Sequence, residues 1–394
     1  MTKSNVQQKS KNGLLLAGIL LIAINLRPAL ASVGPLIEDI RQATGLSNTM
    51  LGLLTTLPLL CFAVVSTLTP FFTKRFGIGG TLLGALVLLV IGIFIRSLDW
   101  VPALYLGTLF LGVAIAFGNV LLPGLTKRNF AKKSGFITSL YSSTMAVGAS
   151  LAAGLSVPLA NELKLGWQGS LRFWMFLALI AVVMWLPQLW RLKKFNPKRS
   201  YLEALKSMGK STLAWKVALF MGLQSFTFYV ILAWLPDILI SRGYDAVFAG
   251  WMLSLSQVTG VLGSLLIPFL AGKRKDQRTI VTSLIIIEII ALLGFIFSAW
   301  GAVEFWIGLI GFVLGGTFGL ALLFIVLRSK DAEGATELSG MAQSIGYLIA
   351  AVGPFIFGSL FDLTGNWELS LSLLIVCGVL KLFMGLGAGK PGHV

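Results

Sequence analysis

The sequence predicts an all-α membrane protein whose twelve transmembrane helices form two pseudo-symmetric bundles of six. Three observations predict this fold class: an apolar composition, a regular series of long apolar runs, and a weak internal repeat. Of the 394 residues, 56% are hydrophobic and only 12% are charged, and the mean hydropathy is +0.89. Soluble domains contain about 25% charged residues, so the composition alone indicates a protein that resides in a lipid bilayer.

Twelve apolar runs are long enough to cross a membrane, which takes about 20 mostly apolar residues. The longest polar segment, 191–211, lies between the sixth and seventh runs. We therefore expect an N-terminal bundle at 1–190, a cytoplasmic linker at 191–213 and a C-terminal bundle at 214–394. The runs are 13–37, 48–72, 79–97, 101–125, 134–160, 169–190, 214–240, 247–271, 279–299, 303–327, 338–361 and 368–388.

Basic residues occur mainly in alternate loops, beginning with the polar segment before the first run. Seven of them fall within 191–211, whereas the intervening loops are rich in acidic residues such as Asp99 and Asp245. The positive-inside rule therefore predicts that both termini and the central linker are cytoplasmic. A formal net charge of +16 would suggest nucleic-acid binding in a soluble protein. Here the basic residues act as topology signals, so we expect no nucleic-acid partner and a chain surrounded by lipid.

A weak internal repeat relates the two halves of the chain. Several glycine, proline, arginine and tryptophan residues fall on a residue of the same type when the sequence is shifted by about half its length. Because each half contains an even number of runs, the two bundles should be parallel repeats with a site between them near the membrane midplane. The matched pairs are Gly45 and Gly243, Gly52 and Gly250, Pro70 and Pro268, Pro35 and Pro236, Arg128 and Arg328, and Trp167 and Trp367.

Five segments of the chain carry distinctive motifs: INLRPALASVGPLIEDI, GLLTTLPLLCFAV, GNVLLPGLTKR, WLPDILISRGY and LSGMAQSIGYLIAAVGP. These segments resemble the major facilitator superfamily and, within it, the branch of the cyanate permease and the 2-nitroimidazole transporter. The resemblance covers nearly the whole chain. It implies secondary transport of small molecules across the bacterial inner membrane, with helices one, four, seven and ten lining a central cavity.

The segment Pro70–Gly80 (PFFTKRFGIGG) is similar to the superfamily's cytoplasmic loop after helix two. The resemblance implies a gating loop that includes Lys74, Arg75 and Gly77. Arg75 and Gly77 fit the family pattern, but Lys74 stands where the family usually has an aspartate. The acidic member of the usual charge relay is therefore missing from this loop.

Arg27 is the most informative residue, because it lies near the middle of the first apolar run. A guanidinium at the bilayer midplane costs from about 2.5 to about 17 kcal/mol, depending on the method, unless something solvates it. Asn25 precedes Arg27, and Pro28 removes a backbone donor and can loosen the helix beside the charge. We expect Arg27 and Asn25 to contact substrate. The alternative is a structural clamp in which Arg27 binds helix carbonyls or a neighbouring acid.

Glu288 is the one carboxylate in the middle of an apolar run. It is a candidate for proton coupling, because burial can raise the pKa of a carboxyl group. The alternative is a structural ion pair with Lys381 in the twelfth run. Lys381 could instead extend its ammonium to the membrane interface.

Other polar residues in the apolar runs are candidates for a substrate pocket, in which a few hydrogen bonds fix the orientation of a ligand. For each of them the alternative is an ordinary hydrogen bond between helices. The candidates are Asn119, Gln224, Tyr229, Thr317, Gln343 and Tyr347.

The sequence argues against an enzyme and against a protein that only receives signals. The two cysteines are separate and the single histidine, His393, is in the tail, so we expect no metal site and no cofactor. An ATP-binding GxxxxGK[ST] motif is absent, and no sizeable soluble output domain is present.

The remaining interpretation is a monomeric secondary transporter for a small anionic or weakly acidic organic solute, with protons as the coupling ion. The alternative is an exporter of neutral aromatic compounds such as nitroimidazoles.

Overall fold

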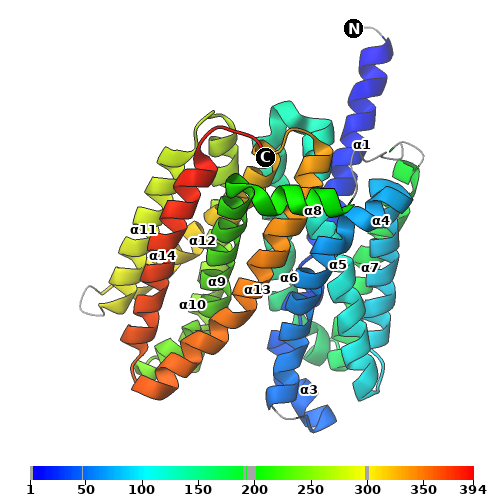
Figure 1. The fold of residues 1–394 in the computed structure, drawn as a ribbon. Helices are drawn as coiled ribbons and strands as arrows, with labels where there is room; N and C mark the ends of the chain where they lie inside the picture. Colours follow the sequence, from blue (N-terminus) through cyan, green and yellow to red (C-terminus); the bar gives the residue numbers. More distant parts are fainter. Residues whose placement is uncertain (1–2, 47, 190–191, 193–200, 298–300) are drawn as a thin grey trace.

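The computed structural model describes residues 3–46, 48–189, 192, 201–297 and 301–394, and all regular structure within them is helical. Two groups of long helices stand side by side, and the short helix α8 (Tyr201–Lys210) lies across them at one end (Figure 1). The first group comprises α1 (Lys3–Asn25), α2 (Pro28–Ala31), η1 (Gly34–Leu36), α3 (Ile37–Thr44), α4 (Asn48–Arg96), α5 (Val101–Phe130), η2 (Ala131–Lys133), α6 (Ser134–Asn161) and α7 (Gly166–Leu189). The second comprises α9 (Thr212–Ser241), α10 (Ala246–Gly272), α11 (Arg278–Ile296), α12 (Val303–Leu327), α13 (Ala332–Thr364) and α14 (Trp367–Gly389).

Ten segments of the described chain are long and apolar enough to span a membrane, and two of these are much longer than one crossing needs. Met50–Arg96 has 47 residues and Val101–Asn161 has 61, whereas a single crossing takes about 20. The first contains Gly77, whose φ of 72° and ψ of 167° interrupt the helix, and the second contains η2. Division at these two points would yield the expected twelve spans. The count of twelve stays a prediction.

The first apolar run, 13–37, was expected to be one helix, and the structure corrects this. The regular helix α1 ends at Asn25, and the chain then passes through α2 and η1 to α3. Pro28 explains the break, because it has no amide hydrogen for the carbonyl four residues earlier and disfavours helical geometry in the residue before it. Accordingly, Arg27 has a φ of −120° and lies between the two helical segments.

The contacts between the two groups of helices include two that are similar. In one, Ser139 of α6 donates a hydrogen bond to the carbonyl of Leu265 in α10. In the other, Ser344 of α13 donates to the carbonyl of Ala63 in α4. A glycine precedes each serine by four positions, and a side chain on it would collide with backbone atoms of the opposite helix. The paired Gly-x-x-x-Ser segments are consistent with the duplication predicted from the sequence.

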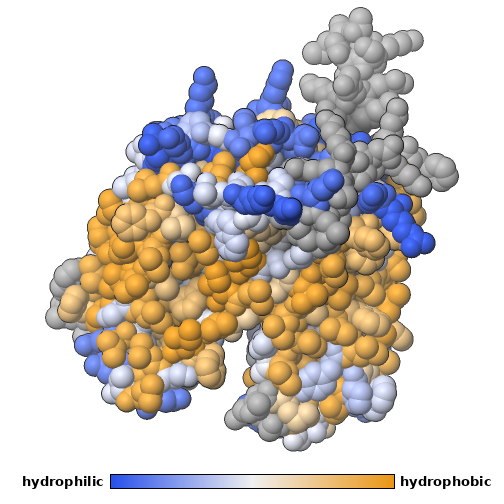
Figure 2. Space-filling view, in the orientation of Figure 1, coloured by the Kyte–Doolittle hydropathy of each residue, from blue (hydrophilic) through white to orange (hydrophobic). Residues whose placement is uncertain are grey.

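The two ends of the molecule differ in polarity and shape. Both termini and α8 lie at one end, where polar residues gather (Figures 1 and 2). At the opposite end a hollow separates the two lobes (Figure 2). A broad apolar band between the ends exposes large side chains, including Phe355 (74%) and Trp251 (69%). Such a surface suits a lipid environment.

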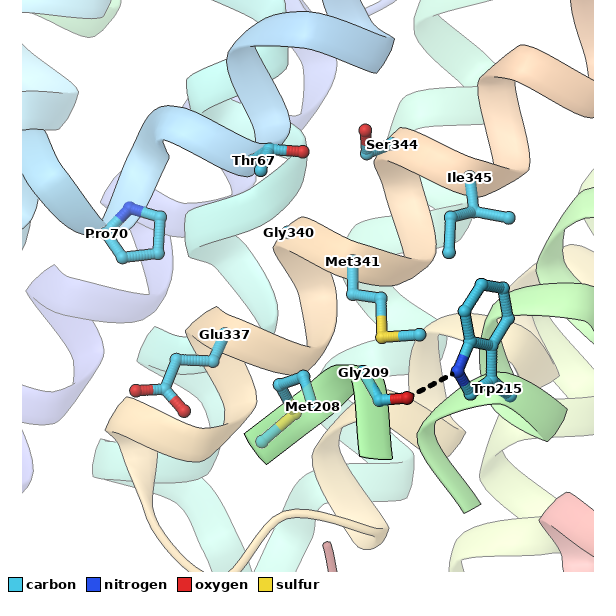
Figure 3. Close-up of a pocket in the computed structure, with 10 residues that line it drawn as sticks. All are labelled: Thr67, Pro70, Met208, Gly209, Trp215, Glu337, Gly340, Met341, Ser344 and Ile345. Atoms are coloured by element: carbon cyan, nitrogen blue, oxygen red, sulfur yellow. Dashed lines mark hydrogen bonds between the residues drawn. The ribbon is translucent and has the colours of Figure 1, made fainter. Parts of the chain in front are cut away.

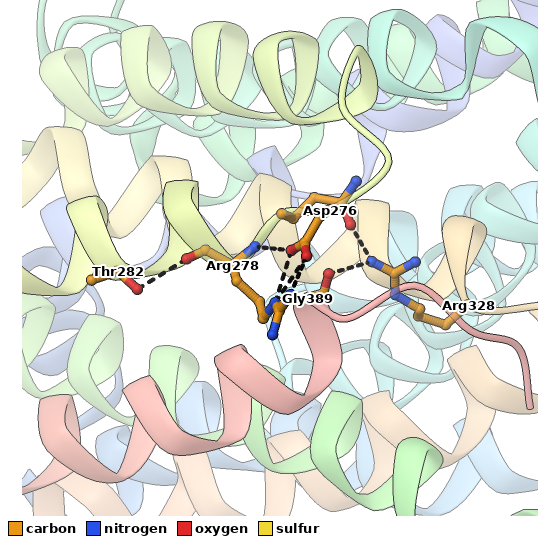
Figure 4. Close-up of polar contacts among 6 residues, drawn as sticks. Asp276, Arg278, Thr282, Arg328 and Gly389 are labelled. Atoms are coloured by element: carbon orange, nitrogen blue, oxygen red, sulfur yellow. Dashed lines mark hydrogen bonds and ion pairs between the residues drawn. The ribbon is translucent and has the colours of Figure 1, made fainter.

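A polar network closes the second group at the end that carries the termini (Figure 4). The buried Arg328, directly after α12, donates from Nε to the carbonyl of Ala388 at 2.6 Å and from Nη2 to that of Gly389 at 3.0 Å. A cation at the last carbonyls of a helix stabilises its C-terminus. In the adjoining loop, hydrogen bonds from Arg278 lower the pKa of the Asp276 carboxyl group.

Candidate functional site

The break in the first transmembrane segment places Arg27 at the start of α2. The carbonyl of Arg27 accepts hydrogen bonds from the amides of Leu30 and Ala31, both at 3.0 Å. Arg27 is therefore the N-cap residue of a one-turn helix whose first residue is Pro28. This local geometry turns the arginine out of the continuous helix that the apolar pattern alone would suggest.

The guanidinium of Arg27 meets aromatic residues of the second helical group. It makes side-chain hydrogen-bonding contacts with Tyr229 of α9 and Tyr347 of α13. Its Cζ lies 5.2 Å from the centre of the Phe318 ring of α12, within the range of a cation–π interaction. Arg27, Tyr229 and Phe318 are each partly exposed, whereas Tyr347 is buried. The arginine thus joins the two halves of the molecule at a partly accessible position.

Two residues of the first helical group hold Tyr347 in place. Asn119 of α5 donates from Nδ2 to the Tyr347 hydroxyl oxygen at 3.5 Å. The ring of Phe62 in α4 packs against the Tyr347 ring, with centroids 4.8 Å apart and planes tilted by 59°. Arg27, Asn119, Tyr229 and Tyr347, together with Phe318, are called the central cluster below.

The direction of the hydrogen bonds determines what the central cluster can bind. A guanidinium only donates, so the hydroxyl oxygens of Tyr229 and Tyr347 accept from Arg27. The Tyr347 oxygen also accepts from Asn119, which leaves its hydrogen available as a donor. Within the described part of the chain, no carboxylate forms an ion pair with Arg27. The cluster therefore presents donors and a positive charge, and it suits a ligand that supplies acceptors.

Two of the residues expected in the pocket donate hydrogen bonds to backbone carbonyls away from the central cluster. Asn25 is 3% exposed and donates from Nδ2 to the carbonyls of Leu21 at 2.7 Å and of Leu177 in α7 at 3.2 Å. Thr317 is fully buried, and its hydroxyl donates to carbonyls of its own helix. The structure does not bring either side chain into the central cluster.

The two glutamine candidates lie on helices that contribute to the central cluster, but among the described residues neither forms a hydrogen bond with a member of it. Gln224 of α9 donates from Nε2 to the Ser225 hydroxyl at 2.7 Å. Gln343 of α13 precedes Tyr347 by one helical turn and is 1% exposed. In both, the buried Oε1 atom has no hydrogen-bond partner among the described residues. Their binding role stays a prediction.

Glu288 and Lys381 form a buried ion pair between α11 and α14. The Lys381 Nζ donates to Glu288 Oε1 at 2.6 Å, and the side chains are 0% and 1% exposed, respectively. Neither helix contributes a residue to the central cluster. The structure thus contains the Glu288–Lys381 ion pair that was one of the alternatives in the sequence analysis. A role of Glu288 in proton coupling stays a prediction.

The expected gating loop lies within α4. Gly77 adopts a φ of 72°, which glycine reaches at little cost, and it separates the two halves of α4. Lys74 and Arg75 are exposed just before it, and the Arg75 Cζ lies 5.4 Å from the centre of the Phe76 ring. The turn itself accounts for Gly77, while a gating role for the two basic residues stays a prediction.

A separate cavity of about 230 Å³ lies between α4, α8, α9 and α13 (Figure 3). Trp215 at one side donates its indole N–H to the carbonyl of Gly209 at 2.9 Å. None of the central-cluster residues lines this space. Within the part of the chain that the structure describes, no group of three histidine, cysteine or acidic residues could hold a metal ion. The cavity lining consists of Thr67, Pro70, Met208, Gly209, Trp215, Glu337, Gly340, Met341, Ser344 and Ile345.

Sequence reasoning missed two residues near the break. Phe318 lies against the Arg27 guanidinium, but a phenylalanine in an apolar run carries no distinctive signal. Arg96 ends α4 and is 1% exposed, and its Nη1 donates to the carbonyl of Ala29 in α2 at 2.5 Å. An arginine at the end of an apolar run looks like an ordinary interface residue, which explains why the sequence did not single it out.

The chain is similar throughout its length to known membrane proteins. The model of the Major Facilitator Superfamily matches residues 19–354. The chain is 42% identical to the 2-nitroimidazole transporter of Escherichia coli (strain K12), over 100% of both chains. It is 28% identical to the cyanate transport protein CynX of the same strain, over 93% of this chain and 94% of that protein. The crystal structure of the E. coli fucose:proton symporter FucP matches with a TM-score of 0.77 at 14% identity, over 97% of this chain and 99% of that one, and shows the fold alone.

Proposed function

Because the chain belongs to the major facilitator superfamily, we propose that it is a secondary active transporter for a small anionic or weakly acidic organic solute. The solute would bind at the central cluster and cross the cytoplasmic membrane by alternating access. The observation that carries this proposal is the contact of Arg27 with Tyr229 and Tyr347, which belong to the opposite helical group.

The charge balance at the central cluster favours an anion. Arg27 stays protonated at any physiological pH, and it forms no ion pair with a carboxylate among the described residues. A carboxylate or a comparable anion could accept two parallel N–H bonds from a guanidinium, which are stronger than bonds between neutral groups. The solute would then serve as the counter-ion that the described residues do not provide.

The names of two relatives suggest two kinds of solute. One relative is named for cyanate, which is a small anion, and the other for 2-nitroimidazole, whose nitro group supplies only acceptors. Both would satisfy the donors of the central cluster, but only the anion would also neutralise Arg27. A neutral nitroaromatic solute, held by its nitro group against Arg27, is therefore the second candidate.

The shape of the molecule supports an outward-open state within the transport cycle. The hollow between the lobes opens at the end opposite the termini, and contacts between Gly-x-x-x-Ser segments and the facing helices join the lobes elsewhere. With the termini placed in the cytoplasm by the positive-inside rule, the hollow faces outward. We expect a monomer in the bacterial inner membrane, with protons as the coupling ion and Glu288 as the candidate that responds to them.

Transport by the purified full-length protein in liposomes would test the proposal. Radiolabelled cyanate, benzoate and 2-nitroimidazole would be offered under imposed pH gradients and membrane potentials. We expect saturable transport of an anion, and at least about a tenfold loss in Vmax/KM for the Arg27→Gln variant, because a bond to a charged group contributes about 1.5–3 kcal/mol.

The matched control is Arg242→Gln. Like Arg27, Arg242 lies against a phenylalanine ring, with its Cζ 4.7 Å from the ring centre, but it donates to a helix carbonyl and lies at the end of α9, about 20 Å along the helix from Tyr229. This variant should transport at nearly the wild-type rate. Transport of the neutral solute alone, at equal rates in both variants, would contradict an anion site at Arg27.

A further inference from the structure

A second arginine, which is buried, contacts the broken segment that carries Arg27. Arg96 is 1% exposed, and its guanidinium donates from Nη1 to the carbonyl of Ala29, at 2.5 Å. Among the described residues its buried Nε and Nη2 atoms have no hydrogen-bond partner, and no carboxylate forms an ion pair with it. A buried charge without a counter-ion costs several kcal/mol. The hydrogen bond to the Ala29 carbonyl is therefore the interaction that offsets part of this cost.

The carbonyl of Ala29 needs a donor because the helix is broken at this place. In a regular helix it would accept from the amide of Val33, four residues later. Here the Val33 amide instead bonds to the carbonyl of Leu30, at 3.4 Å. Arg96 supplies the missing donor, and a bond from a guanidinium is stronger than one from a neutral amide.

The bond to Ala29 acts on the position of Arg27. Ala29 lies in the one-turn helix α2, and the first carbonyl of that turn belongs to Arg27. Arg96 also has little freedom to move away. At Gly107 of α5, an added side chain would collide with the backbone amide and Cβ of Arg96, so α5 packs directly against it.

We propose that Arg96 is a positioning residue, which holds α2 in the broken conformation that presents the Arg27 guanidinium to Tyr229 and Tyr347. The proposal rests on the proposed substrate role of Arg27. If the Val33 amide returned to the Ala29 carbonyl, Arg96 would have to share its acceptor with that amide. Arg96 therefore stabilises the broken form of the first segment over a continuous helix.

The test uses the full-length protein and two readouts, one of which needs no substrate. In Arg96→Met the buried charge and the donor to Ala29 are both removed, and apolar replacement of a buried charge is often tolerated or even stabilising. Arg96→Lys restores the charge and a donor. Arg172→Met is the matched control, because Arg172 donates to the carbonyl of Ser97 at 2.9 Å, next to Arg96, and is exposed.

The first readout is amide hydrogen exchange over residues 26–36, and the second is the dependence of initial transport rate on solute concentration. In Arg96→Met we expect exchange in this segment to be faster by about tenfold and KM to rise by about tenfold, while Vmax changes little and the melting temperature does not fall. Arg96→Lys should recover part of both effects, and Arg172→Met should show neither.

Unchanged exchange over residues 26–36 in Arg96→Met would overturn the proposal, whatever happens to transport. A lower melting temperature with wild-type exchange and wild-type KM would also overturn it, because Arg96 would then serve stability alone. Failure of the transport proposal is separate: it would appear as wild-type transport in Arg27→Gln, and it would leave the exchange result valid.

Discussion

Removal of the Tyr347 hydroxyl is the sharpest perturbation of the central cluster. The Tyr347→Phe substitution keeps the ring, so the packing against Phe62 at 4.8 Å between centroids should persist. It removes the oxygen that accepts from Arg27 and from Asn119 Nδ2. The perturbation therefore changes the electrostatics of the cluster and leaves its shape nearly unaltered.

The expected magnitude follows from the bonds that the hydroxyl makes. A hydrogen bond to a charged group contributes about 1.5–3 kcal/mol, which corresponds to at least about a tenfold change in affinity. The guanidinium would be oriented less firmly, and the hydroxyl hydrogen that an anion could accept would be gone. We expect KM for an anionic solute to rise by about tenfold, with a smaller effect on a neutral solute because only the Arg27 side of its bond is charged.

Initial uptake rates in proteoliposomes, measured over a range of solute concentrations, would give KM and Vmax. Tyr141→Phe is the control, since Tyr141 is equally buried and its hydroxyl contacts Thr138 of its own helix, not the central cluster. A wild-type KM for anions in Tyr347→Phe, or an equal rise in both variants, would refute the argument that Tyr347 acts through Arg27.

Two further perturbations address the ion pair and the turn. Glu288→Gln should lower thermal stability in detergent, because loss of one partner of a buried pair typically costs about 3–5 kcal/mol. The double variant Glu288→Leu with Lys381→Met should melt near the wild type, and equal melting of single and double variants would refute the structural role. Intact proton-driven uptake in Glu288→Gln would exclude the coupling role. Gly77→Ala should destabilise the protein by about 1 kcal/mol, because alanine tolerates a φ of 72° poorly, whereas Gly84→Ala in a regular part of α4 should not.

Hydrophobic runs predicted most of the helices, because burial in lipid and helical length leave a strong pattern in the sequence. The run 303–327 coincides with α12, and the run 214–240 lies within α9. The run 13–37 was misread as one helix, since hydropathy does not register the missing amide of Pro28. The predicted linker at 191–213 contains α8, while 190–191 and 193–200 lie outside the described residues.

Part of the candidate site could be predicted because a charge and polar groups in apolar runs are rare. Arg27, Asn119, Tyr229 and Tyr347 come together in the structure, although their role in binding stays a prediction. Thr317 does not join them, since a threonine hydroxyl in a helix readily bonds to a carbonyl of its own preceding turn. Asn25 likewise bonds to backbone carbonyls. Sequence alone does not show which of these local bonds will form.

The two arginines of the first half illustrate why residue type and position alone do not reveal role. Arg27 lies mid-run and is partly exposed beside aromatic residues, whereas Arg96 lies at the end of a run and is buried against a carbonyl. Hydropathy would rank Arg27 as the more costly of the two and Arg96 as ordinary. The broken helix reverses this ranking. It brings Arg27 to Tyr229, Tyr347 and Phe318 of the central cluster, and it frees the Ala29 carbonyl to accept from Arg96. The proline that interrupts the helix therefore determines the solvation of both charges, and the function of each follows from that solvation.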